Sequence, residues 1–206
     1  MSLSRRALIG LLAVTTLAGC IGGASFQTYY AAPLPASLTS GWQVADVRVA
    51  VPETLVVSEA KTLLPKADIV WREDPLGDRR AQIATIMRSA VQRGASGLRG
   101  SRRVYVDITM TRFHALTFEA ETRLSNAGVH NVNFLVQIVD AATGEVLVPA
   151  TPIQAELPAL SGEEMRAARR RGETQKSQIS AHVARTIAGW LGTGPDPRNA
   201  FGRSGN

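Results

Sequence analysis

The chain contains a single cysteine, Cys20, which is the side chain in the sequence best suited to covalent chemistry. It closes a short apolar run, residues 7–17, that follows the basic pair Arg5 and Arg6. A thiolate is a good nucleophile, so a cysteine in this position can accept a transferred group. A disulfide within the chain is excluded because there is no second cysteine. The pattern therefore predicts a modified thiol.

Leu17, Ala18 and Gly19 precede Cys20, and these four residues resemble the lipobox of bacterial lipoproteins. Residues 1–19 have the basic start, short apolar stretch and small-residue end of a cleaved secretory signal, and the stretch is too short to span a bilayer. The resemblance implies cleavage before Cys20, acylation of that residue and attachment of the mature chain to a membrane. The alternative is an ordinary cleaved signal followed by an incidental cysteine.

Residue 21 and the basic pair indicate location and export route. Ile21 stands where an aspartate retains enterobacterial lipoproteins in the inner membrane, so the resemblance implies the periplasmic face of the outer membrane. The outer face of the inner membrane is the alternative. Arg5 and Arg6 fit both the general secretory route and a twin-arginine signal, and Leu8 stands where the latter carries phenylalanine. We expect the general route.

Composition and charge exclude some partners. The formal net charge is +6, with 45% hydrophobic and 19% charged residues, which is an ordinary globular balance. A basic chain can bind nucleic acid, but here the basic residues are not interleaved with aromatic ones, and an exported lipid-anchored chain rarely meets nucleic acid. We therefore expect no nucleic-acid partner, and anionic lipid headgroups or an acidic protein are the better candidates.

A cluster of four arginines is the strongest feature outside the expected core. Its members are Arg166, Arg169, Arg170 and Arg171. Ser161 and Glu164 have the spacing of a capping box, which places the cluster in the first half of a helix. One hypothesis is contact with anionic headgroups or an acidic partner; the other is a solvated helix face partly neutralised by Glu163 and Glu164.

Motifs for catalysis, metal binding or cofactor binding are missing from the sequence. The three histidines, His114, His130 and His182, have no H-E-x-x-H or H-x-H spacing, and there is no G-x-S-x-G elbow or phosphate loop. We interpret His114 and His130 as residues that satisfy backbone groups beside a strand connection. We therefore predict no catalytic residues, no metal and no cofactor, and a protein that is not an enzyme.

Hydrophobic periodicity predicts strands and two helices. The expected strands cover residues 42–51, 67–71, 103–113, 129–140 and a return strand from 145 that prolines make irregular or place at an edge. The expected helices cover residues 79–93 and 161–191, the second with a break near Gly172, and 59–64 could form a helical turn. The pattern predicts an α+β fold, in which a mostly antiparallel sheet of about four or five strands carries two helices on one face.

The composition also divides the chain. We expect a signal peptide over residues 1–19, a lipidated N-terminus and flexible tether over 20–41, one α+β domain over 42–193, and a disordered tail over 194–206.

From Val47 to Leu191 the chain resembles an uncharacterised family of alphaproteobacterial lipoproteins. The segments that carry the resemblance are residues 68–71, 111–116, 128–131 and 140–144. The element order is also similar to that of ABC-transport auxiliary lipoproteins. Together these resemblances imply a non-catalytic accessory or binding subunit in envelope maintenance or lipid transport, with an envelope protein complex or a lipid as its partner.

Two alternatives to that role stay open. One is a structural envelope assembly factor, and the other is a hydrolase whose site is built from residues distant in sequence. A deep apolar pocket under the helices would favour lipid handling, whereas a flat exposed patch would favour protein docking.

Overall fold

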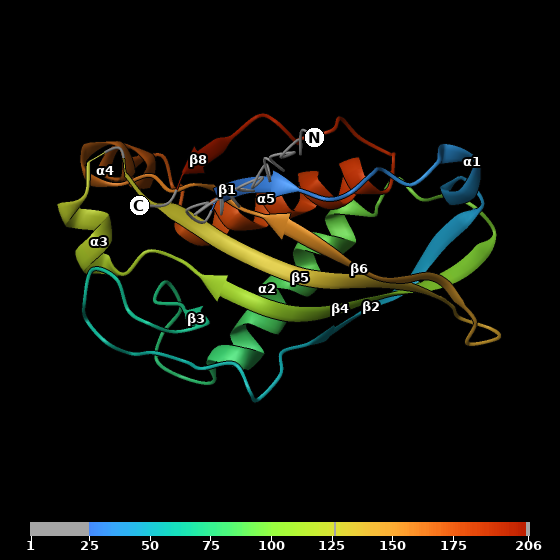
Figure 1. Ribbon diagram of the computed structural model, residues 1–206, viewed down its shortest axis with the longest axis horizontal. Coiled ribbons are helices and arrows are strands. Elements are labelled where there is room, and N and C mark those ends of the chain that lie inside the picture. The colour runs from blue at the N-terminus through green and yellow to red at the C-terminus, as the bar shows by residue number, and fades with distance from the viewer. Residues whose placement is uncertain (1–24, 126, 205–206) are drawn as a thin grey trace, which may run out of the picture.

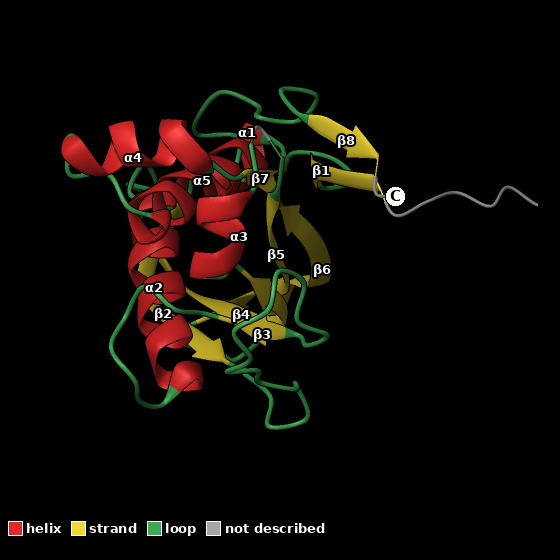
Figure 2. Ribbon diagram, turned by 90° about the vertical axis from the view of Figure 1, so that its left-hand side faces the viewer, coloured by secondary structure: helices red, strands yellow, loops and turns green. Residues whose placement is uncertain are grey.

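The computed structural model describes residues 25–125 and 127–204, which form an α+β domain with its larger helices on one side of a sheet (Figures 1 and 2). The expected α+β class is therefore confirmed. Among the described residues, none of the helices combines the length and the apolar character that crossing a membrane requires.

The sheet is larger than expected and mixed in direction. Its eight strands within the described residues are β1 (Ser25–Tyr29), β2 (Trp42–Ala50), β3 (Ile69–Val70), β4 (Arg102–His114), β5 (Val129–Asp140), β6 (Val146–Ala155), β7 (Leu157–Pro158) and β8 (Gly202–Ser204). The order is β2-β4-β5-β6-β1-β8, with β3 paired to β4 and β7 to β5. The pairings of β2 and β3 with β4 are parallel, and the others are antiparallel.

The parallel pairs correct the expectation of four or five mostly antiparallel strands, and they have a simple cause. A helix that lies between two strands carries the chain back across the sheet, so the second strand starts at the same end as the first. The helix α2 (Arg79–Gly94) does this between β3 and β4. The antiparallel expectation holds for β4, β5 and β6, which follow one another without a crossover over the sheet.

Both expected helices are present, and the second is divided. Asp78 caps α2, because its side chain accepts hydrogen bonds from the backbone of Arg80 and Ala81. The second helix is interrupted at Gly172, whose φ of 80° suits glycine, and this gives α4 (Gly162–Arg170) and α5 (Gln175–Trp190). The structure also contains two short helices that the sequence did not predict, α1 (Ala36–Thr39) and α3 (Phe118–Arg123).

The core lies between the sheet and the pair α2 and α5. On β5 the apolar side chains alternate inward as expected, and all four of them are buried: Val132, Phe134, Val136 and Ile138. The inward stripe of α5, which includes Ile179, Val183, Ile187 and Trp190, is buried against the same core. Each large side chain buried in this way contributes roughly 1.5–3 kcal/mol to folding, so both helices are integral to the domain.

The segments before and after the expected domain are folded, contrary to the expectation of a flexible tether and a disordered tail. Residues 25–41 were expected to form a tether, but they contribute β1, α1 and the fully buried Tyr30. Residues 194–204 were expected to be disordered, but they contribute β8, and the Tyr30 hydroxyl donates a 2.7 Å hydrogen bond to Asp196. The guanidinium of Arg198 lies 4.6 Å from the Tyr30 ring centre. One aromatic side chain thus joins two low-complexity segments to the domain.

Three local expectations can also be compared with the structure. The segment 59–64 is not helical. Ser161 stands at the N-cap of α4, but its hydroxyl donates to the Ala127 carbonyl at 3.3 Å and does not cap the helix, so the predicted capping box is wrong. The irregular return strand is confirmed, because the pairing of β5 with β6 shifts register twice.

Candidate functional site

The predicted lipobox residues Leu17, Ala18 and Gly19 and the predicted lipid acceptor Cys20 lie outside the described residues. The described chain nevertheless begins close to them, because β1 starts at Ser25, five residues after Cys20.

The arginine cluster on α4 is paired with acids. Arg166 and Arg170 both contact Glu163, at 2.8 and 3.5 Å, and Arg171 contacts Glu173 at 2.8 Å. The pairing lowers the pKa of Glu163, chiefly through its hydrogen bond to Arg166. The structure therefore favours a locally neutralised helix face, and contact of this cluster with anionic headgroups stays a prediction.

Arg169 is the centre of a network that joins three helices. Its guanidinium lies 2.7 Å from Glu73, which follows β3, and 2.8 Å from Glu121 of α3. Gln175, at the start of α5, donates its side chain to Glu121 at 2.6 Å and its backbone to Glu73 at 2.8 Å. The hydrogen bond to Glu121 is the main cause that raises the pKa of Arg169. This network holds α3, α4 and α5 together and has a structural role.

A cavity of about 630 Å³ lies at the end of the sheet where β4 ends and β5 begins. Strand β1, the loop before β3 and the chain after α3 complete its wall. Most of the lining residues are apolar: Phe26, Leu63, Leu64, Pro65, Ala115, Leu116, Leu124, Ala127 and Val129. The others are Lys66, Arg112, His114, Gly128 and Asn131. We call this cavity the β4–β5 pocket.

Part of the apolar wall is a small hydrophobic cluster separate from the main core. Leu116 packs with Ala120 and Ala159, and Leu63 and Leu124 pack against these residues. The hydroxyl of Thr117, the N-cap of α3, donates to the Thr62 carbonyl at 2.9 Å and ties the loop before β3 to the helix. The pocket is therefore built by segments that are fixed to one another.

A β-bulge directs two polar side chains of β4 toward the pocket. The register shifts between Met110 and Arg112, so Thr111 is the extra residue in the pairing of β4 with β5. Strict alternation would place Arg112 and His114 on the core face with Met110. The bulge places Phe113 in the core instead, where it packs edge-on against Trp71 at 5.5 Å. A bulge re-aims the side chains that follow it, and here it turns Arg112 and His114 outward.

The outward side chains of β4 face polar partners on β5. Arg112 pairs across the strands with Asn133, and His114 pairs with Asn131. Arg112 Nη2 donates to His114 Nδ1 at 3.1 Å. Burial and then the nearby charge of Arg112 lower the pKa of His114.

Strands β4 and β5 near this wall contain buried polar atoms without hydrogen-bond partners among the described residues. They are Arg112 Nε, Asn131 Oδ1, Asn133 Oδ1 and both ring nitrogens of His130. Buried polar atoms are nearly always paired in folded proteins, so such a concentration marks an unusual region. His130 lies on the core side of β5, where burial lowers its pKa to about 3. Its imidazole nitrogens satisfy no backbone group, contrary to our interpretation from the sequence.

The histidines do not assemble a metal site. His182 of α5 lies 2.9 Å from the Thr28 hydroxyl, far along the chain from the other two, and burial lowers its pKa to about 4. Within 25–125 and 127–204, no group of three or more histidine, cysteine, aspartate or glutamate side chains is placed to hold a metal ion.

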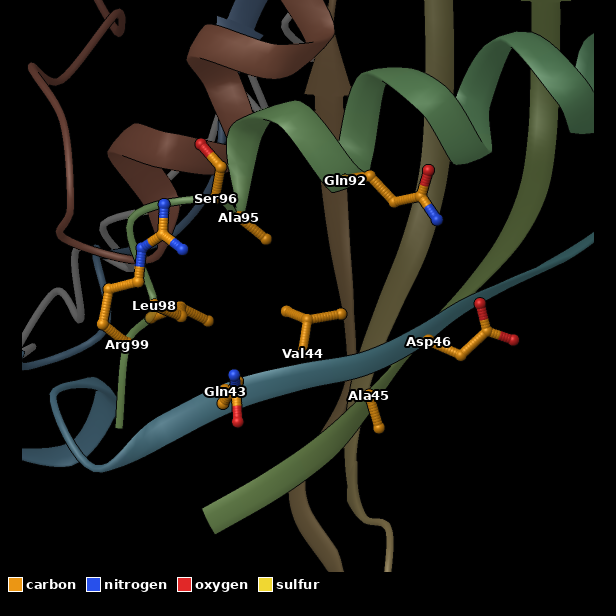
Figure 3. A pocket seen from close by; sticks show the side chains of 9 residues that line it. All are labelled: Gln43, Val44, Ala45, Asp46, Gln92, Ala95, Ser96, Leu98 and Arg99. Carbon is orange, nitrogen blue, oxygen red and sulfur yellow. The ribbon is translucent and has the colours of Figure 1, made fainter. Parts of the chain in front are cut away.

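A second, smaller cavity of about 260 Å³ lies between β2 and the end of α2 (Figure 3). Val44 points from β2 toward Ala95 and Leu98, while Asp46 and Arg99 stand at opposite ends of the hollow. The charged groups do not converge on one point. The β4–β5 pocket is therefore the stronger candidate site.

Comparison with known proteins gives a family assignment. A family model matches residues 42–206, and its description is "Family of unknown function (DUF6778)". The chain belongs to this family. No curated protein sequence matches this DUF6778 member.

Two solved structures show how distant the structural relatives are. A "putative lipoprotein" from Caulobacter crescentus CB15 is 14% identical, with a TM-score of 0.33, and covers 78% of this chain and 96% of its own. The PelC dodecamer from Paraburkholderia phytofirmans, in space group P6, is 12% identical, also with a TM-score of 0.33, and covers 81% and 96%. Likeness at this TM-score assigns neither fold nor function to the DUF6778 chain.

Part of the sequence evidence for the β4–β5 pocket lies in the segments that carry the family resemblance. Two of the segments that carry the family resemblance, residues 111–116 and 128–131, supply both strand walls of the pocket. Each segment places a polar residue beside buried apolar ones, as Arg112 beside Phe113 and Asn131 beside Val132. The bulge that brings them to one face has no clear sequence signature.

Proposed function

We propose that this protein is a membrane-anchored envelope lipoprotein that acts as a non-catalytic binding subunit and holds the apolar chain of a lipid in the β4–β5 pocket. The observation that carries the proposal is the cavity of about 630 Å³ with its mainly apolar wall. Pockets of this size, with a few polar groups in an apolar lining, are typical of small-molecule sites. The pocket lies at the end of the sheet and not under α2 and α5, but its wall has the apolar character that lipid handling requires.

The position of the pocket relative to Cys20 supports the proposal. Phe26 of β1 lines the pocket and is six residues from Cys20. Because residues 25–41 belong to the domain, the segment between the anchor and the fold is short. A lipidated Cys20 would therefore keep the pocket near a membrane, where a lipid ligand is available.

An exposed leucine beside the pocket fits the same location. Leu64 lines the pocket and is 81% exposed. Phe118, at the start of α3, is also exposed, and it adjoins Thr117, which is bonded to the Leu64 loop. A membrane surface beside the pocket could cover these two apolar side chains, which would favour this location.

The anchor is tested by replacing the acceptor thiol. Cys20→Ser should move the protein from the membrane fraction to the soluble fraction or leave it unprocessed, because no other cysteine can be acylated. Metabolic labelling with a fatty-acid analogue followed by fractionation measures this. Equal labelling of the wild type and the variant would exclude the lipoprotein assignment.

The pocket is tested by calorimetric titration of the purified protein with dodecanol, an uncharged amphiphile. We expect saturable binding that Ala127→Trp abolishes, because Ala127 is an exposed residue in the wall and a larger side chain there fills the pocket. Ala142→Trp is the matched control, since Ala142 is an exposed residue of the β5–β6 turn. Absence of binding, or binding that both variants retain, would instead favour a structural envelope assembly factor.

A further inference from the structure

We infer that the ligand of the β4–β5 pocket is an anionic amphiphile, with one apolar chain in the pocket and a carboxylate or phosphate head at Lys66 and Arg112. This inference rests on the proposed function and names the chemical class of its ligand. It follows from two observations: the charge of the lining and the unpaired polar atoms in the wall.

The charged lining residues of the pocket are both cationic. Lys66 and Arg112 line it, and no aspartate or glutamate does. Within the described part of the chain, Lys66 is exposed and has no hydrogen bond or ion pair. The side chain of Arg112 is 37% exposed, so part of it is accessible although its Nε is buried. An anion that enters the pocket therefore meets uncompensated positive charge at Lys66.

Two acids lie near Arg112 but leave it available. Asp68 Oδ1 is 3.8 Å from Arg112 Nη1, which is at the limit of an ion pair, and both side chains are partly exposed. Glu156 is buried, accepts a hydrogen bond from the Gln27 backbone at 2.9 Å, and does not line the pocket. Neither acid faces Lys66 at ion-pair distance. Arg112 is thus oriented by its neighbours without being fully neutralised.

The polar wall offers unused hydrogen-bonding capacity. Arg112 Nε and Asn131 Oδ1 are buried and have no partner among the described residues, although both side chains belong to the lining. Leaving buried polar groups unpaired is unfavourable, so a polar ligand group that lets this wall rearrange and pair is favoured. A purely apolar ligand would leave this cost in place.

The lining combines apolar side chains with the two cations. Leu116 belongs to the small hydrophobic cluster, and Leu63 and Leu124 pack against that cluster. Lys66 follows Leu63 by three residues, and Arg112 comes from β4. A ligand with a chain against the leucines can therefore direct its head toward the two cations.

The inference is tested by titrating the Cys20→Ser protein with four amphiphiles of equal chain length: dodecanoate, dodecyl phosphate, dodecanol and dodecyltrimethylammonium. Cys20→Ser prevents acylation, so the protein's own anchor cannot compete. We expect the two anions to bind at least ten-fold more tightly than dodecanol, and the cation to bind most weakly. The anion preference should shrink in high salt, because exposed charges are screened.

Charge-removing variants locate the head. Lys66→Gln and Arg112→Gln should each weaken dodecanoate about five-fold, as expected for a partly exposed charge pair, and leave dodecanol unchanged. Lys61→Gln is the matched control, since Lys61 is exposed in the same loop but does not line the pocket. Arg112→Lys should retain most of the anion preference, which separates loss of charge from a folding defect.

The outcomes separate the two proposals. Equal affinity for dodecanoate and dodecanol would overturn the anion inference and leave the proposed apolar pocket intact. Failure of all four amphiphiles to bind would overturn the proposed function itself. A clear preference for dodecanoate or for dodecyl phosphate supports the inference and distinguishes a fatty-acid head from a phosphate head.

Discussion

The α4 arginine cluster and the β4–β5 pocket are both basic regions, but they differ in how their polar groups are satisfied. Arg166, Arg169, Arg170 and Arg171 all have a carboxylate within ion-pair distance. In the pocket, Lys66 has no such partner in the described chain, and Arg112 retains a buried nitrogen without an acceptor. The region with more arginines therefore offers less positive charge to a ligand. Availability depends on the surrounding acids, which local sequence does not show.

Among the variants that test this comparison, Arg169→Gln should have the largest effect on stability. Arg169→Gln leaves Glu73 and Glu121 nearly buried without their cation, so we expect a loss of about 2–3 kcal/mol in the free energy of unfolding, reduced from the fully buried case because Arg169 is partly exposed. Urea unfolding measures this. Arg170→Gln, whose only ion pair is exposed, should change stability by less than about 0.5 kcal/mol. Similar losses in both variants would show that the network is not structural.

His130, whose buried ring nitrogens have no hydrogen-bond partner among the described residues, should make the stability of the fold sensitive to acid. Burial lowers its pKa to about 3, whereas an unfolded histidine has a pKa of about 6.5. Below pH 6.5 the unfolded chain therefore binds a proton that the folded chain does not, and stability falls as the pH falls toward 3. Between pH 7 and pH 5 this residue should account for a loss of about 2 kcal/mol.

His130→Leu should remove that part of the acid sensitivity, because leucine has no proton to bind. Urea unfolding of the wild type and the variant at pH 7 and pH 5 measures it. His182 contributes acid sensitivity to both proteins and cancels in the comparison. An identical loss of stability in the two proteins would mean that His130 is solvated or paired in solution.

The smallest effect is expected on the exposed face of α4. Replacing Arg166, Arg170 and Arg171 together with Gln should leave flotation of the protein with anionic vesicles almost unchanged, since these arginines already have Glu163 and Glu173 as partners. The Cys20→Ser background removes the anchor from the measurement. If flotation is lost in the triple variant and restored by low salt, the cluster contacts headgroups after all, and the contrast with the pocket is wrong.

The sequence was sufficient for elements whose pattern is strictly periodic. The apolar stripes of α2 and β5 gave the correct elements to within a residue or two, because burial enforces their periods. The parallel direction of β2 and the number of strands in the sheet were harder to predict from the sequence. Both depend on pairing between distant segments, and the five-residue strand β1 lies in a stretch whose glycine, serine and alanine content resembles a linker.

The candidate site was harder to predict than the fold. The alternation in β4 assigned Phe113 to the face opposite Met110, which would have left Arg112 and His114 facing the core. The bulge at Thr111 keeps these polar side chains out of the core. It directs Arg112 and His114 into the lining of the pocket instead. The tyrosine that fixes the N-terminal segment, Tyr30, needs Asp196 and Arg198 from the other end of the chain, a pairing invisible to local patterns.

The most direct test of the account is photo-crosslinking in the native envelope. Cells that express the wild-type protein are fed a photoactivatable fatty acid and irradiated, and the modified peptides are mapped by mass spectrometry. The account predicts label within residues 63–66, 112–116 and 124–131, abolished by Ala127→Trp and retained by Ala142→Trp, in addition to acylation of Cys20. Label that is confined to Cys20, or pocket label that survives Ala127→Trp, would contradict a lipid-binding role for the β4–β5 pocket.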